Sequence, residues 1–201
     1  MSFHSRMASG LVVMVFAIAS TGFPQSSGTQ EAPVTSMAAK LADIVAHGSA
    51  PAERQAARET RASEAEMRAF LLAGVTLPDG VTDPDLTLVG EGTVIAEAVV
   101  DLDRVRSGRA GSWTDPLSFL SGRLPVRASG VLHATSGVAR IEVERVEVGG
   151  IGVPHLLLRE LVAAYTRSDD QPAGLDLDGE YPLPYRVQEI RILAGEVVVV
   201  Q

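Results

Sequence analysis

Two pairs of aspartates are the side chains in this sequence best suited to acid–base chemistry. Asp101 and Asp103 follow one predicted strand, and Asp176 and Asp178 stand in a polar segment nearer the C-terminus. Two neighbouring carboxylates can divide the roles of general acid and general base in a hydrolase. Each pair also fits a solvated strand end or a turn, which is the interpretation we favour. Residues 176–180 resemble the start of a calcium loop, but the later ligands of that pattern are missing.

The four histidines (His4, His47, His133 and His155) are scattered singly along the chain. None has a second ligand at the spacing that a zinc site requires. The sequence contains no cysteine, no Gly-x-Ser-x-Gly elbow, no His-Glu-x-x-His helix and no glycine-rich phosphate loop. We therefore expect no catalytic residues, no metal and no cofactor, and the protein is not expected to be an enzyme. An unrecognised hydrolase is the alternative.

An apolar segment between two predicted strands, 112–120, offers binding rather than catalysis. It holds the single tryptophan, Trp113, together with Leu117, Phe119 and Leu120. A connection of this length inside a compact domain is uncommon and is often a lid or a binding loop. The alternative is a short helix, begun at Pro116, that plugs the end of the sheet.

The first nineteen residues have the layout of a secretory signal peptide. A weakly basic start precedes the unbroken apolar run Leu11–Ile18, and Ala17 and Ala19 form a small-x-small cleavage site. We expect a protein that is periplasmic or secreted and begins near Ser20. The alternative is an uncleaved N-terminal anchor.

Composition excludes several classes of partner. Without Arg6, which lies in the predicted signal, the chain has 16 basic and 25 acidic residues, a net charge of about −9. Nucleic acid is therefore not expected as a partner, because phosphate binding needs clustered Lys and Arg. Aromatic residues make up 4% of the chain, so the core must be built from Val, Leu, Ile and Ala.

Periodicity divides the chain into a flexible linker over 20–36, a helical preface over 37–62 and an α+β domain over 63–201. A capping box at Ser63 and Glu66 starts one helix, and the run His155–Thr166 forms another, with a broad apolar stripe. Strands are predicted over 93–101, 123–133 and 138–149, with a β-bulge at Glu144-Arg145, and a closing hairpin turns at Gly195. The predicted fold class is α+β. It combines a curved, mainly antiparallel sheet of about six strands, wrapped on the C-terminal amphipathic helix, with two or three N-terminal helices.

The C-terminal third carries two stretches that occur together in a known family. The first is Gly-x-x-Val-Pro-x-x-Leu-Leu-x-x-Leu from Gly150 to Leu161, and the second runs from Leu183 through Pro184 and Tyr185 to Val187, Ile190 and Ile192. These stretches resemble bacterial cell-envelope lipid-binding proteins typified by the actinobacterial lipomannan elongation factor. Arg186 stands where that family usually has glycine. The resemblance implies an exported protein with a tubular lipid-binding fold whose ligand is the acyl part of a phospholipid or glycolipid.

Two functional hypotheses remain open at this point. In the first, the protein binds or shuttles a lipid or another apolar small molecule in an apolar cavity and touches membrane surfaces transiently. In the second, the same apolar faces form a filled core in an envelope scaffold that recruits a protein partner. The residues expected to contact lipid are Trp113, Leu117, Phe119, Leu120, Val126, Leu132, Ile141, Val143, Leu157, Leu161, Tyr165, Ile190 and Val198.

Overall fold

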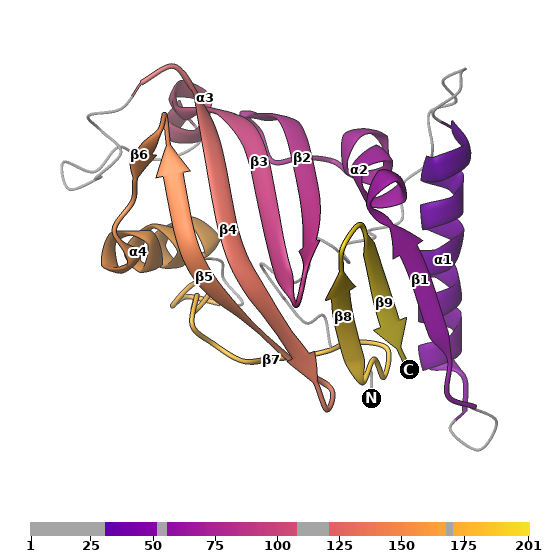
Figure 1. The fold of residues 1–201 in the computed structure, drawn as a ribbon. Helices are drawn as coiled ribbons and strands as arrows, with labels where there is room; N and C mark the ends of the chain where they lie inside the picture. The colour runs from indigo at the N-terminus through magenta and orange to yellow at the C-terminus, as the bar shows by residue number, and fades with distance from the viewer. Residues whose placement is uncertain (1–30, 52–55, 108–120, 168–170) are drawn as a thin grey trace, which may run out of the picture.

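A computed structural model describes residues 31–51, 56–107, 121–167 and 171–201. Within these ranges the fold is α+β with a mostly antiparallel six-stranded sheet, as predicted, and it contains four helices (Figure 1). A second, three-stranded sheet was not predicted. The helices are α1 (Glu31–Ser49), α2 (Glu64–Ala73), α3 (Leu102–Ser107) and α4 (His155–Thr166). The strands are β1 (Glu59–Ser63), β2 (Val81–Gly90), β3 (Thr93–Asp101), β4 (Arg123–Thr135), β5 (Val138–Val148), β6 (Ile151–Gly152), β7 (Tyr181–Pro182), β8 (Glu189–Leu193) and β9 (Glu196–Val200).

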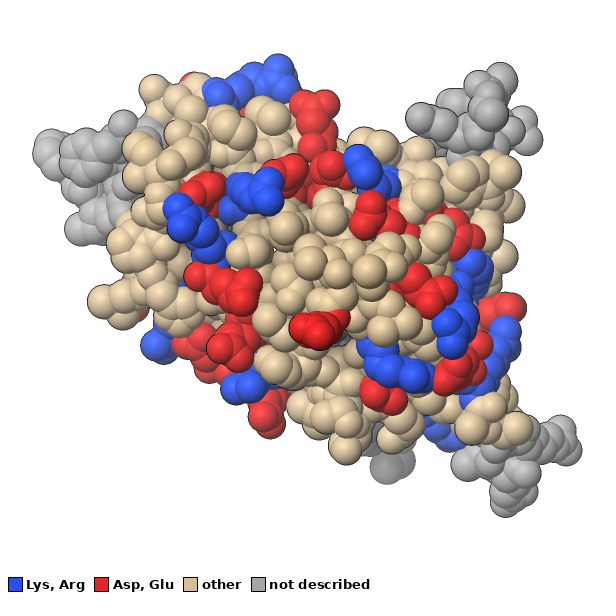
Figure 2. Space-filling model, in the orientation of Figure 1, with Lys and Arg blue, Asp and Glu red and all other residues tan. Residues whose placement is uncertain are grey.

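The six-stranded sheet has the order β2-β3-β4-β5-β6, and β7 also pairs with β5. The predicted bulge is confirmed: Ser129 pairs with Arg145 and Gly130 with Val143, which leaves Glu144 as the extra residue. Such a bulge bends and twists its strand. Strand alternation separates an apolar inner face from an outer face on which acidic and basic side chains are interspersed (Figure 2).

The closing hairpin β8–β9 forms the second sheet with β1, in the order β1-β9-β8. The prediction of a helical preface that continues to residue 62 is therefore wrong from Glu59 onward, because Glu59–Ser63 pairs antiparallel with Glu196–Val200. Pairing with the valine-rich strand β9 stabilises this segment as a strand, although its alanine favours a helix. The predicted linker 20–36 is also too long, since α1 begins at Glu31.

Helix α2 starts at the capping box that the sequence predicted. The Ser63 side chain accepts a hydrogen bond from the backbone N–H of Glu66, and the Glu66 carboxylate accepts one from the N–H of Ser63. A second carboxylate of the first turn, Glu64, accepts a hydrogen bond of 2.7 Å from the backbone N–H of Leu88. The Glu64 carboxylate of α2 therefore satisfies the backbone N–H of Leu88. This N–H lies at the edge of the sheet and would otherwise lack a hydrogen-bond partner.

Helix α1 lies alongside the three-stranded sheet, and α2 lies between α1 and β2 of the larger sheet (Figure 1). The α1 residues Met37, Leu41 and Ile44 recur at helical spacing and are buried in the main core cluster. The same cluster includes residues of α2, of both sheets and of the segment before β8. Helix α1 is therefore a structural layer of the domain rather than a detached preface.

The C-terminal end of α1 meets a tight corner of the chain at Tyr185 and Arg186. Both residues have left-handed backbone angles, with φ of 54° and 56°. At Arg186 the chain thus adopts a backbone conformation that favours glycine. A hydrogen bond of 2.8 Å from the side-chain amide of Gln201 to the carbonyl of Tyr185 fixes the corner, and a second of 2.9 Å from the same nitrogen reaches the carbonyl of Ile44.

Candidate functional site

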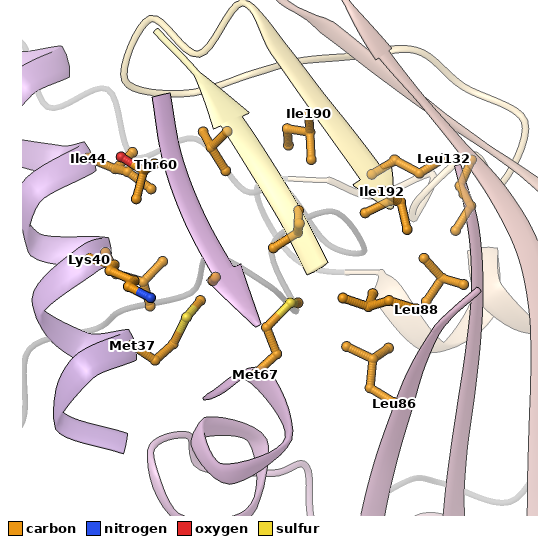
Figure 3. Close-up of a pocket in the computed structure, with 16 residues that line it drawn as sticks. Met37, Lys40, Ile44, Thr60, Met67, Leu86, Leu88, Leu132, Ile190 and Ile192 are labelled. Carbon is orange, nitrogen blue, oxygen red and sulfur yellow. The ribbon is translucent and has the colours of Figure 1, made fainter. Parts of the chain in front are cut away.

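A cavity of about 140 Å³ lies between α1 and the two sheets (Figure 3). Its walls come from three layers of the fold, and most of their side chains are aliphatic or methionine. The sixteen residues that line it are Met37, Lys40, Leu41, Ile44, Thr60, Ala62, Met67, Leu86, Leu88, Val94, Leu132, Ile141, Ile190, Ile192, Val197 and Val199.

Strand register explains why the three-stranded sheet presents one apolar face to the cavity. Val199 lies between Thr60 and Ile190, and the next row down places Val197 between Ala62 and Ile192. Side chains two residues apart point to the same face of a strand. The opposite face carries the charged residues of β1 and β8, whose ion pairs include Arg61 with Glu196 at 2.8 Å.

Lys40 and Thr60 are the polar residues in the described lining. The ammonium group of Lys40 contacts both carboxylate oxygens of Glu66, at 2.5 and 2.7 Å, and the hydroxyl of Ser36 donates to the same carboxylate at 2.5 Å. This pair joins α1 to α2 beside the cavity and neutralises the one positive charge in its wall. The arrangement suits an uncharged apolar ligand better than an anion, because an anion would have to displace Glu66 from Lys40.

The Glu66 carboxyl has a strongly lowered pKa. Burial raises it, but the hydrogen bonds from Lys40, Ser36 and Ser63 together outweigh that effect and bring the pKa from 4.5 to about 2. A carboxylate held in this way is charged throughout the physiological range. The link between α1 and α2 therefore persists throughout the physiological pH range.

Low pH should weaken the link between Lys40 and Glu66 and so lower the free energy of unfolding. Because the pKa of Glu66 is lower in the folded protein than in the unfolded chain, its stabilising contribution is complete above about pH 4.5 and disappears as the pH falls toward 2. After screening by solvent we expect a loss of about 1–2 kcal/mol in the free energy of unfolding. Urea titrations between pH 5 and pH 2 should show a smaller loss in Glu66→Gln than in the parent protein. The exposed Glu160→Gln should behave like the parent, and equal losses in all three proteins would contradict the assignment.

The inner face of the large sheet continues beyond the cavity. On β5, Val143, Val146 and Val148 follow Ile141 along this face once the bulge is counted, and each is half-buried rather than buried. On β4 the partners Val126 and Ala128 are also half-buried. At roughly 3.3 Å per residue, the distance from Ile141 to Val148 is about 20 Å. We call this half-buried strip of β4 and β5 the apolar track.

Three of the residues expected to contact lipid, Leu132, Ile141 and Ile190, line the cavity. Val198 does not. It is buried, with 0% of its surface exposed, but it lies on the opposite face of β9, where its register partners are Arg61 and Arg191. The expectation that Val198 would line the cavity is therefore wrong.

The other expected contacts lie away from the cavity or outside the described residues. Val126 and Val143 belong to the apolar track, and Leu157 and Leu161 are half-buried on α4. Trp113, Leu117, Phe119 and Leu120, with the predicted lid or plug, lie outside the described residues, as does the side chain of Tyr165.

The cavity also uses residues that were not expected to contact a ligand, including Met37, Leu41 and Ile44 on α1 and Met67 on α2. The signal for the α1 residues is present in the sequence, since an amphipathic helix requires a partner for its apolar stripe. The partner is the three-stranded sheet, which forms only when β1 pairs with β9.

The aspartate pairs occupy structural positions. Asp101 accepts hydrogen bonds of 3.1 Å from the backbone N–H groups of Asp103 and Arg104, at the start of α3. Asp178 forms an ion pair of 3.2 Å with Arg159 of α4 and lies 3.2 Å from His155 Nε2, and Asp176 accepts a hydrogen bond from the backbone N–H of Asp178 in a turn. In the described part of the chain, no group of three His, Asp or Glu side chains is arranged to hold a metal ion.

No family model, curated protein or solved structure matches the chain. Over the residues that the structure describes, no helix combines the length and apolar character needed to cross a membrane. The predicted signal peptide lies outside this range.

Proposed function

We propose that the protein binds the acyl chain of a phospholipid or glycolipid, with the end of the chain in the cavity and the rest along the apolar track. The observation that carries the proposal is the cavity itself: among the described residues, its lining is apolar except for Thr60 and the neutralised Lys40. Burying each methylene of such a chain contributes about 0.8 kcal/mol, without any specific polar contact.

The size of the cavity limits what it can hold. An engineered cavity of about 150 Å³ lined by Leu, Ile and Phe binds benzene, so a space of 140 Å³ accommodates one group of that size. A complete acyl chain needs more room, and the apolar track supplies it. Since the hydrocarbon core of a bilayer is about 30 Å thick, the chains of one leaflet extend about 15 Å, which the track of about 20 Å can cover.

Helix α4 is the element suited to cover the track. Its stripe of Leu157, Leu158, Leu161 and Val162 is half-buried, and Figure 1 shows β5 passing in front of this helix, with the charged outer face of the sheet turned toward the viewer in Figure 2. A curved sheet with a helix over its inner face is the arrangement that the resemblance to tubular lipid-binding proteins implies. In this proposal α4 and the sheet together form the tube.

The proposed location is the bacterial envelope, in the periplasm or outside the cell. The predicted signal peptide motivates it. A carrier that shields acyl chains from water has an evident use there, because a lipid must leave one membrane surface to reach another site. The competing hypothesis, a scaffold with a filled core, accounts less well for an unfilled apolar space among buried side chains.

Organic-solvent extraction of the purified protein, followed by mass spectrometry, tests the proposal. We expect co-purified phospholipid or glycolipid in about stoichiometric amount. Ala62 lines the cavity and is buried, so Ala62→Phe should fill the space and reduce the bound lipid severalfold. The matched control is Ala65→Phe on the exposed side of α2, which should retain lipid.

The stability of both variants must be measured with their lipid content, because overpacking costs about 1–3 kcal/mol. A folded Ala62→Phe protein with unchanged lipid content would place the ligand elsewhere. A parent protein without lipid, which also fails to bind added fatty acid, would overturn the proposal.

A further inference from the structure

The two most exposed of the large apolar side chains in the described residues stand close together in the chain. Ile151 on β6 is 69% exposed, and Leu156 in the first turn of α4 is 71% exposed. Burying either side chain would be favourable, by an amount comparable to that of a core residue. Two such residues at one connection mark a contact surface rather than scattered surface leucines.

This connection lies at the end of the apolar track away from the cavity. Ile151 pairs with Val148 at the end of β5, and the N–H of Val153 donates to the carbonyl of Val146 at 2.8 Å. Ile141, which lines the cavity, is on the same strand about 20 Å away. An acyl chain that enters the track opposite the cavity therefore enters beside Ile151, five residues before Leu156 in the chain.

The connection begins with a tight turn. Gly149 and Gly150 have φ of 60° and 80°, the left-handed turn that glycine allows, and they reverse the chain between β5 and β6. A Cβ atom built at Gly150 or Gly152 would meet no described heavy atom within 4 Å. Ile151 therefore stands at an open turn, where its side chain is accessible to a lipid surface.

Three basic side chains on β5 and α4, the two elements that this connection joins, lie beside carboxylates. Arg145 contacts Glu147 at 2.6 Å, and His155 and Arg159 share Asp178 at 3.2 Å. The whole chain carries a formal charge of −8. Attraction to anionic lipid headgroups therefore supplies little, and contact with a membrane must depend on apolar insertion.

We infer that Ile151 and Leu156 form a membrane-inserting tip, through which an acyl chain passes between a bilayer and the track. The inference rests on the proposed function for the identity of the cargo. It commits to a lipid bilayer as the partner, bound without dependence on its surface charge. The tip is a docking surface and is separate from the cavity that holds the end of the chain.

Co-sedimentation with phosphatidylcholine vesicles tests the tip. The exported protein should bind these vesicles, with no more than a twofold change between about 0.1 and 0.5 M salt or on addition of anionic lipid. The double variant Ile151→Asp/Leu156→Asp should bind about tenfold more weakly or worse, the loss expected when two large apolar side chains stay in water. The matched control Leu72→Asp/Leu193→Asp changes two exposed apolar residues on α2 and β8 and should bind like the parent.

Undiminished vesicle binding by the tip variant would overturn the inference, and so would binding that requires anionic lipid and disappears in salt. A parent dimer that the tip variant converts to a monomer, without vesicle binding by either, would assign the surface to a second copy of the chain. A soluble fluorescent fatty acid separates this test from that of the proposed function. The tip variant should bind this fatty acid from solution as well as the parent does. If the parent fails to bind it, the proposed lipid binding is refuted, and vesicle binding alone then tests whether Ile151 and Leu156 contact a membrane.

Discussion

Replacing Leu41 with aspartate should lower the free energy of unfolding by about 3–5 kcal/mol, the largest loss we expect from a single substitution. Leu41 is 1% exposed on α1, belongs to the main core cluster and forms part of the cavity wall. An aspartate carboxylate at this position would lose its hydration and be surrounded by apolar side chains. The nearest cation, Lys40, already holds Glu66. Urea denaturation followed by circular dichroism measures the change.

The neighbouring substitution Ala42→Asp is the matched control, because Ala42 is exposed on the other side of the same helix. It should change stability by about 0.5 kcal/mol or less. Leu161→Asp on the half-buried stripe of α4 should fall between the two. If Leu41→Asp unfolds no more easily than Ala42→Asp, α1 does not cover the cavity in solution, and the proposed site loses one wall.

Replacing Gly48 with alanine should destabilise the protein by about 2–3 kcal/mol, although only a methyl group is added. The new Cβ would lie 2.6 Å from the Cα of Tyr185 and closer still to its carbonyl group. These are backbone atoms of the left-handed corner at Tyr185 and Arg186, so no side-chain rotation relieves the contact. The end of α1 would have to move away, and the cavity would open beneath it.

The control for this substitution is Gly152→Ala on β6. Gly152 has no positive φ, and a Cβ there meets no described atom within 4 Å. Thermal unfolding should show a clear fall in Tm for Gly48→Ala and little change for Gly152→Ala. Equal melting temperatures would mean that α1 and the Tyr185 corner are not in contact.

The parts of the fold that depend on local patterns could be predicted from the sequence. The capping box at Ser63 and the bulge at Glu144 are each encoded within a few residues, and the structure confirms both. Helix α4 has the predicted bounds because its apolar stripe begins directly after Pro154. Leu132, Ile141 and Ile190 line the cavity, and polar residues on both sides of Ile141 and Ile190 show the alternation of their strands.

The remaining errors come from residues whose structure depends on distant partners. Glu59–Ser63 has the composition of a solvated helix and becomes a strand only because β9 pairs with it. The run Val197–Val200 contains no polar residue, so its alternation cannot show which valines face inward. Val198 was assigned to the wrong face for this reason, and the contribution of α1 to the cavity was missed because the sheet that it covers could not be foreseen.

The pairing of β1 with β9 also determines when the interior can be assembled during biosynthesis. Residues 59–63 emerge from the ribosome, or from an export channel, long before residues 196–200, yet the small sheet needs both. Until the last strand arrives, the apolar side of α1 has no complete surface to cover, and such exposed faces favour aggregation. Contacts this distant in sequence also slow folding. The apolar interior is thus among the last parts of the molecule to close, and a chain stalled before β9 would depend on a chaperone to remain soluble.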